Sequence, residues 1–264
     1  FTEMQSLETI KQQATAGNAL TLTTAGSTAL ELVQLVENNT DTNNITASDL
    51  AAGVAVELIS DADVGDQNMA TVTLGLNDAS GDSDSMTVTL KGTSGHAAAS
   101  NTIDTLSIGN VETVNLVSSH DGTTALLATD DNTITSAVLT NATTLNMSGS
   151  DQLAVTVATT TTLTTADAST MTDDVSLTLD NVTADMTVKT GSGDDTISMA
   201  AKLNNADTID GGANSLSTTV DTLSATVTGL TATTGALNVS NVERLNLTNG
   251  GTTVIDAPNI AGAN

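Results

Sequence analysis

The residues best suited to chemistry lie in a stretch rich in glycine and aspartate, residues 190–213, which reads TGSGDDTISMAAKLNNADTIDGGA. Within it Asp195 and Asp207 each stand two residues before an isoleucine. Glycines permit tight turns, and carboxylate and carbonyl oxygens are the ligands that hard cations prefer. The apolar residue that follows each acid can turn into a core and anchor the turn. The stretch therefore predicts a cation site built from oxygen atoms.

The spacing fits the nine-residue pattern G-G-x-G-x-D-x-U-x, in which U is a large apolar residue. A first copy begins at Thr190, which replaces the first glycine, and a second copy has no glycine at its fourth position. A third copy begins nine residues after the second, has Asn214 in place of a glycine, and is interrupted by an insertion before its acid. The expected metal ligands are Gly191, Gly193, Asp195, Asn205, Asp207, Gly211, Gly212 and Asp221.

The ligand chemistry of this pattern favours Ca²⁺ over Zn²⁺ or copper, because all the candidate donors are hard oxygens. Glycine and aspartate are also common turn formers, so an ordinary turn without an ion is the alternative. Because the third copy is broken, we expect one or two ions rather than a long series.

Other acidic groups and both histidines suit solvated loops better than a site. His96 and His120 each lie in a polar loop, and we expect both to be solvated. The lower-ranked acidic clusters are Asp61, Asp63 and Asp66; Asp78, Asp82 and Asp84; Asp130 and Asp131; and Asp173 and Asp174.

The composition excludes several classes of protein. The chain has 264 residues, 31 acids against 5 Lys and Arg, a net charge of −26, no Cys, Trp or Tyr, and one Phe. Nucleic-acid binding needs a basic surface and often stacking aromatics, so it is not expected. Cysteine-dependent sites and disulfides are excluded. No apolar run is long enough to span a membrane as a helix, and the acidity favours cations as partners.

The first 68 residues are expected to form a small helical or mixed α/β region. Residues 3–14, 27–37 and 47–60 contain helix formers with apolar positions suited to one helical face. A strand over residues 54–59 is the alternative in the third segment, since Gly53 weakens a helix there.

After residue 68 the apolar period changes to two. Residues 69–76 and 85–90 alternate apolar residues with Thr, which is typical of strands with one solvated face. We expect a hairpin region over residues 69–100, with an acidic loop between these two strands.

From residue 101 to residue 264 the chain is repetitive. Residues 106–116 (LSIGNVETVNL) and 237–247 (LNVSNVERLNL) match without a gap, and weaker copies occupy residues 139–147, 157–165 and 179–188. Two short strands around an Asn-centred bend suit a stack of parallel coils, which needs only Leu, Ile and Val in its core. The fold expected is mainly β, a parallel β-roll or β-helix; a β-sandwich of short Thr-rich strands is the alternative.

On these residues the chain resembles the repeats-in-toxin (RTX) surface proteins of Gram-negative bacteria, in particular their Thr-rich, Cys-free S-layer proteins. The segments that carry the resemblance are GSGDDTI at 191–197, ADTIDGGA at 206–213, VDTLSA at 220–225 and the two N-V-E segments. The RTX-like segment spans residues 190–223, and the likeness covers roughly residues 100–255.

The resemblance implies a calcium-dependent β-roll, export by a type I secretion system and self-assembly into a two-dimensional lattice on surface polysaccharide. It implies an extracellular, cell-surface location and no enzymatic activity. We also expect the chain to be a processed product or part of a longer protein.

Three functions remain open from the sequence: a structural S-layer subunit, an RTX-type adhesin or stalk domain, and a β-helical enzyme acting on polysaccharides. The enzyme would need basic residues gathered along one groove, and the five cations are scattered.

Overall fold

The computed structural model describes residues 8–14, 19–25, 27–37, 43–60, 67–93, 101–121, 132–158, 160, 162–213, 220–227, 237–250 and 260–261. All regular elements in these residues are β-strands. No helix long and apolar enough to cross a membrane occurs in this part of the chain.

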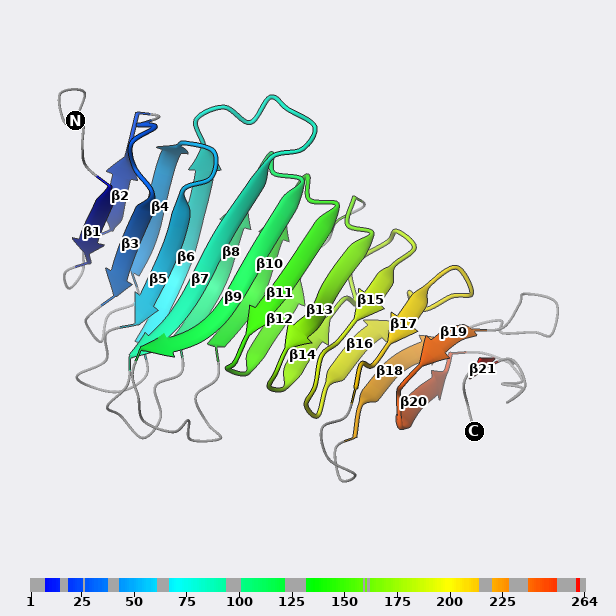
Figure 1. The fold of residues 1–264 in the computed structure, drawn as a ribbon. Coiled ribbons are helices and arrows are strands. Elements are labelled where there is room, and N and C mark those ends of the chain that lie inside the picture. The colour runs from blue at the N-terminus through cyan, green and yellow to red at the C-terminus, as the bar shows by residue number, and fades with distance from the viewer. Residues whose placement is uncertain are drawn as a thin grey trace.

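The odd-numbered strands form an 11-stranded sheet, here called sheet A. Each strand pairs in parallel with the next odd-numbered strand (Figure 1). Its strands are β1 (Thr9–Gln13), β3 (Leu32–Glu37), β5 (Ala55–Ser60), β7 (Ser85–Thr93), β9 (Thr113–Asp121), β11 (Thr144–Gly149), β13 (Thr165–Met171), β15 (Thr187–Lys189), β17 (Thr208–Asp210), β19 (Leu237–Ser240) and β21 (Ile260–Ala261).

The even-numbered strands form a 10-stranded sheet, here called sheet B, which is also parallel throughout. Its strands are β2 (Leu20–Thr23), β4 (Asn43–Leu50), β6 (Gln67–Leu76), β8 (Asn101–Ile108), β10 (Asn132–Leu139), β12 (Leu153–Val157), β14 (Val175–Thr178), β16 (Thr196–Ala200), β18 (Thr222–Val227) and β20 (Arg244–Asn249).

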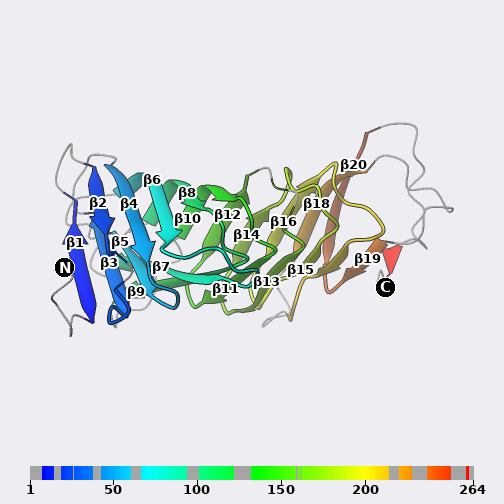
Figure 2. The same ribbon diagram turned by 90° about the horizontal axis from the view of Figure 1, so that it is seen from above.

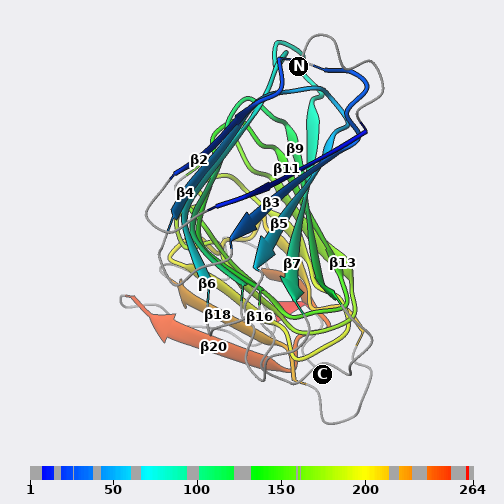
Figure 3. The same cartoon turned by 90° about the vertical axis from the view of Figure 1, so that its left-hand side faces the viewer.

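Because consecutive strands alternate between the sheets, the chain winds as a coil with one strand of each sheet per turn, called a rung below. The two sheets face each other in the end-on view of Figure 3. The connections that follow odd-numbered strands form the A-to-B edge of the coil, and those that follow even-numbered strands form the B-to-A edge. This arrangement confirms the prediction of a mainly β, parallel β-roll or β-helix.

Aliphatic side chains fill the space between the sheets. Val155, Leu177, Ile197 and Leu223 are stacked in register across β12, β14, β16 and β18, and each is at most 2% exposed. Each rung needs only a thin layer of such side chains, which explains how a chain with one aromatic residue folds. The stack is elongated, with β1 and β20 at opposite ends (Figure 2).

The Asn-centred bends predicted from the repeats are present. Asn110 precedes β9 and Asn241 precedes β20, with φ of 57° and 53°, a conformation that Asn tolerates better than most residues. The 31-residue step between the copies at 106–116 and 139–147 matches the register of β8 with β10. However, residues 106–116 lie at the B-to-A edge and residues 237–247 at the A-to-B edge. The repeating unit is therefore half a rung.

The prediction of helices in the first 68 residues was wrong where the structure describes them. Strands β1, β3, β4 and β5 occupy parts of the three predicted segments, and β5 confirms the alternative strand of the third. Leu35 and Leu58 are fully buried and pair in register. Burial between stacked rungs therefore overrides helix propensity.

The predicted hairpin was also wrong. Strands β6 and β7 cover the two alternating segments, but they belong to different sheets and are not paired with each other. The loop between them is a B-to-A connection. The described strands of residues 1–68, 69–100 and 101–264 all join the same two sheets.

Candidate functional site

Five carboxylates share one position, immediately before a strand, and one role. In each case a carboxylate oxygen accepts a hydrogen bond from the backbone N–H of the neighbouring, earlier rung, at 2.7–2.9 Å. These bonds satisfy amides at the start of the ladder that would otherwise be buried without a partner. We call the five the cap carboxylates: Glu112, Asp195, Asp207, Asp221 and Glu243.

This role explains the D-x-U part of the sequence pattern. Asp195 accepts from the amide of Val175 at 2.7 Å, the next residue Thr196 faces outward, and Ile197 is 2% exposed in the core. Asp207 and Asp221 precede an outward Thr and an inward apolar residue in the same way. The acid, the strand start and the core anchor are therefore one local structural unit.

The predicted metal ligands fall on two opposite edges of the coil. Six of them lie in the A-to-B connections that follow β15 and β17, which occupy adjacent rungs. Asn205 and Asp207 lie in the B-to-A connection between β16 and β17 instead. The structure thus brings together Gly191, Gly193, Asp195, Gly211, Gly212 and Asp221.

The glycines at the A-to-B edge permit close approach between rungs. A Cβ on Gly211 would lie 1.8 Å from the carbonyl oxygen of Asn241 in the next rung. Gly212 has φ +89° and would place a Cβ 2.1 Å from the carbonyl oxygen of Gly191. These positions therefore need glycine for backbone packing, whether or not an ion is bound.

Asp195 and Asp221 each keep one carboxylate oxygen without a partner. Both side chains are at most 2% exposed, and the Oδ2 atom of each is buried and accepts no hydrogen bond. The Thr190 hydroxyl lies close enough to Asp195 to lower the pKa of that carboxyl, but its hydrogen bond at 2.7 Å goes to the carbonyl of Gly211. Buried carboxylate oxygens without a partner are costly, so this pair has unused capacity to bind a cation or a proton.

Neighbouring acids add to this cost. Burial is the main cause that raises the pKa of Asp221 to about 6, and the carboxylates of Asp195, Glu243 and Asp194 raise it further. Burial also raises the pKa of Asp195, against the lowering effect of the Val175 amide, the Thr190 hydroxyl and the Gly191 amide. The edge therefore holds negative charge at the expense of stability.

In earlier rungs of sheet B, the residues at the positions that correspond to Asp195 and Asp221 are uncharged. Asn101 and Asn132 are in register at the start of β8 and β10, followed by Leu153 of β12. Asn101 donates to the carbonyl of Leu58 and Asn132 donates to the hydroxyl of Ser118, so amides there replace carboxylates. Any dependence on cations is thus expected to concentrate in the rungs from β16 onward.

A Ca²⁺ ion fits this edge in part. The unpartnered oxygens of Asp195 and Asp221 are hard donors, as such an ion requires. Among the described residues, however, no group of three or more His, Cys, Asp and Glu side chains is arranged to hold a metal. An ion here would therefore use Asp195 and Asp221 together with backbone carbonyl oxygens, and it would supply the positive charge that the edge lacks.

We expect the metal-free protein to lose stability as the pH rises from about 4 to about 6. The pKa of Asp221 is raised from 3.8 in the folded chain, so folding retains a proton in this interval that the unfolded chain releases. This contribution is fully present below pH 3.8 and is lost above pH 6. Chemical denaturation in EDTA across this range would measure it.

The matched control is Asp221→Asn, whose side chain cannot ionise. The difference in free energy of unfolding between the natural chain and this variant isolates the contribution of Asp221 from that of the other acids. A difference independent of pH between 4 and 7 would contradict the expectation.

At the B-to-A edge, both carboxylate oxygens of Asp207 accept hydrogen bonds. Asp207 accepts from the amides of Met186 and Asn204, each at 2.7 Å, and Asn204 donates to Asp185 at 3.2 Å. Burial raises the pKa of Asp207, and Asp185 raises it further. Asn205 is exposed at this turn.

The lower-ranked acidic clusters differ in their surroundings, and Asp84, immediately before β7, also has a buried Oδ2 without a hydrogen-bond partner. Asp174 accepts from the amide of Asp194 at 2.7 Å and from Gln152, so it belongs to the A-to-B edge. Asp78 is exposed and binds only Ser80 of its own loop. The residues Asp61, Asp63, Asp66, Asp130, Asp131, Asn214 and His96 lie outside the described residues.

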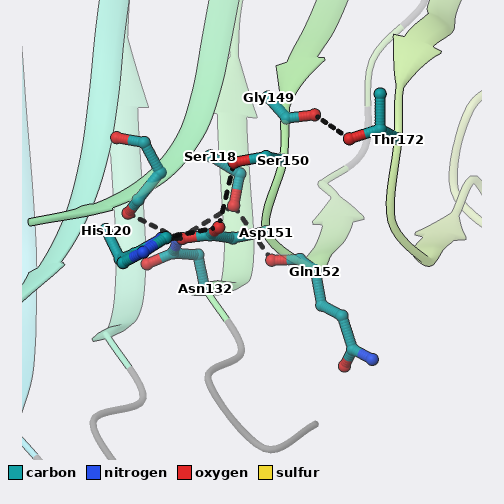
Figure 4. A network of polar contacts seen from close by, with 9 residues as sticks. Ser118, His120, Asn132, Gly149, Ser150, Asp151, Gln152 and Thr172 are labelled. Atoms are coloured by element: carbon teal, nitrogen blue, oxygen red, sulfur yellow. Dashed lines mark hydrogen bonds and ion pairs between the residues drawn. The ribbon is translucent and has the colours of Figure 1, made fainter. Parts of the chain in front are cut away.

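The expectation that His120 is solvated was wrong. His120 is half-buried, and its Nδ1 lies 3.0 and 3.1 Å from the two carboxylate oxygens of Asp151, which is 2% exposed (Figure 4). Ser118 donates to the carbonyl of Gln152, and Asn132 donates to Ser118. Asp151 is 31 residues from His120, so only the stacking of rungs could reveal the pair.

A groove of about 510 Å³ opens beside the same edge. It is lined by the ends of β13, β15 and β17 and by Asn241, and Lys189 is the one basic residue among those that line it. Lys189 stands in register between Asp167 and Asp210. The groove does not gather the several cations that an enzyme acting on acidic polysaccharides would need.

The chain matches no family model, no curated protein and no solved structure.

Proposed function

We propose that this chain is a structural, non-enzymatic protein of the cell surface, an S-layer subunit or a segment of one, in which Ca²⁺ stabilises the stacked rungs. The observation that carries the proposal is the pair of buried, unpartnered carboxylate oxygens of Asp195 and Asp221 within an acidic edge. A bound cation would satisfy these oxygens and offset the repulsion from Asp194 and Glu243.

The parallel coil supports a structural role. Each rung contacts only its neighbours, so stability is a sum over rungs and their interfaces. An ion between two rungs at the A-to-B edge therefore strengthens the coil locally. The resemblance to RTX surface proteins supports secretion to a calcium-rich exterior and attachment to surface polysaccharide, which belong to the same proposal.

A stalk or adhesin domain of the same secretion class is the second candidate, favoured by the elongated stack with its first and last rungs at opposite ends (Figure 2). Electron microscopy of the purified protein with calcium separates the two. A lattice or filament supports an S-layer role, whereas isolated rods support the stalk.

Calcium should stabilise the folded chain through Asp195. At a concentration 100 times the dissociation constant, one site contributes about 2.7 kcal/mol. Asp195→Ala should abolish this gain and destabilise the rungs from β16 onward, since it also removes the cap on Val175. Asp78→Ala should keep the gain, because Asp78 is exposed and bonded only within its own loop. Calcium-titrated thermal melting measures both.

The variant Asp195→Asn distinguishes the role of Asp195 in binding an ion from its role as the acceptor for the amide of Val175. The amide oxygen can still accept from Val175, so stability in EDTA should be equal to or above that of the natural chain, while the calcium gain disappears. If Asp195→Asn and Asp78→Ala respond to calcium as the natural chain does, the ion is bound elsewhere. If EDTA changes neither the melting temperature nor the assembly, the calcium proposal fails.

A further inference from the structure

The outer face of sheet B carries almost no charge, although the chain as a whole has a net charge of −26. Five neighbouring strands, β10, β12, β14, β16 and β18, contain no charged residue at all. In the ten strands of this sheet the charged residues are Asp49, Asp104 and Arg244.

The outward positions of these strands form columns of small hydroxyl side chains. In one column Ser176, Thr196 and Thr222 are in register on β14, β16 and β18. In the next column Thr178, Ser198 and Ser224 are in register on the same three strands. All are half-buried or exposed, and we call them the neutral face: Thr156, Ser176, Thr178, Thr196, Ser198, Thr222 and Ser224. The hydroxyl of Ser198 donates to the carboxylate of Asp180, which lies two residues after β14 and marks the border of this face.

Sheet A differs at the matching rungs. Its outer face carries Asp167, Lys189 and Asp210 on β13, β15 and β17, in register with one another. Elsewhere on the described strands of sheet A, Lys91 of β7 forms an ion pair with Glu57 of β5, and the cap carboxylates lie at the edges. The five strands of sheet B from β10 to β18 are therefore less charged than the matching part of sheet A.

We propose that the neutral hydroxyl face of sheet B is the surface through which one copy of this chain packs on a second copy. Two chains of −26 charge repel each other wherever charged surfaces meet, and a face without charge avoids most of this repulsion. The proposal rests on the self-assembly in the proposed function and names the face that carries it.

The chemistry of the face is self-complementary, as a two-fold contact between identical surfaces requires. A hydroxyl group both donates and accepts hydrogen bonds, so Thr and Ser can pair with the same residues of a second copy. A carboxylate face would offer acceptors only, and a lysine face would offer donors only. Among the described surfaces, sheet B therefore suits contact between identical chains better than the acidic edges do.

The area is also sufficient. The ten strands have 4 to 10 residues each, and at about 4.8 Å between strands and about 3.3 Å per residue they present roughly 1,000 Å². A specific interface of standard size buries about 800 Å² on each partner. The five strands without charge offer about half of this, so a contact of standard size must extend onto neighbouring strands of the sheet, in which Asp49, Asp104 and Arg244 are the charged residues.

Introduced charge tests the face. Ser176→Glu with Thr196→Glu places two carboxylates on exposed positions of the neutral face. The matched control is Ser169→Glu with Ser240→Glu, which adds the same charge at exposed positions of sheet A. Sedimentation at several protein concentrations in saturating calcium measures the dissociation constant between copies, and circular dichroism checks that each variant is folded.

We expect the sheet B variant to raise the dissociation constant at least about 100-fold, because a two-fold contact brings each new carboxylate in twice. The control should change it by less than about threefold. An equal effect of both variants, or no effect of either, overturns the proposal, as does a natural chain that stays monomeric at every concentration. Calcium-dependent melting is independent of these results, so a failure of this face leaves the calcium proposal standing.

Discussion

Gly211→Ala should destabilise the chain by about 3 kcal/mol or more, among the largest effects expected of a single methyl group. The new Cβ would lie 1.8 Å from the carbonyl oxygen of Asn241, far inside contact distance, and that oxygen belongs to the backbone of the next rung. The rungs of β17 and β19 would have to separate, which would weaken the hydrogen bond from the amide of Gly211 to the carbonyl of Ser240.

The matched control is Gly109→Ala. An added Cβ at Gly109 meets nothing within 4 Å, and its φ lies outside the left-handed range. We expect a change within about 0.5 kcal/mol there. Urea denaturation of both variants compares the two free energies of unfolding. Equal stability of the two variants would show that the rungs at the A-to-B edge are not packed as tightly as described.

Leu177→Ala should cost about 2–5 kcal/mol, the usual range for truncating a fully buried leucine. Leu177 is 1% exposed and stands between Val155 and Ile197 in the stacked core column. A coil only one layer thick has few other side chains that could move into the cavity. Because each rung is stabilised by its neighbours, the loss should also weaken β12 and β16.

Ser176→Ala is the control for this substitution, since Ser176 precedes Leu177 on the same strand but faces outward and is exposed. Its effect should stay within about 0.5 kcal/mol. Hydrogen exchange of the amides of β12, β14 and β16 should report faster opening in Leu177→Ala alone. Protection unchanged in those strands would contradict a core shared between neighbouring rungs.

The strands after residue 68 could be predicted because alternation of apolar residues with Thr is a local property. The same alternation does not tell which strand is the partner. Residues 69–76 and 85–90 read like a hairpin, and the structure places β6 and β7 in two facing sheets. A strand with one buried face has the same pattern in either arrangement.

The first third could not be assigned in this way. The run LVQLVE of β3 is short, and helix and strand periods are hard to distinguish over six residues. This segment forms a strand because it pairs with β1 and β5, and this pairing buries Val33, Leu35 and Val36 completely. That pairing involves residues 23 positions away in each direction and leaves no mark in the local sequence.

By itself, the sequence predicted a thin parallel coil for residues 101–264, with a β-sandwich as the alternative, and it determined the Asn-centred bends and the acid-and-glycine turns, because these features depend on spacing within about ten residues. The tertiary structure decided which turns meet. A strand carries the chain from one edge to the other, so successive copies of the nine-residue pattern alternate between edges, and Asp195 lies beside Asp221 while Asp207 lies opposite. It also decided that the acids cap amides of the preceding rung and that two buried oxygens stay unpartnered, since both depend on how rungs stack.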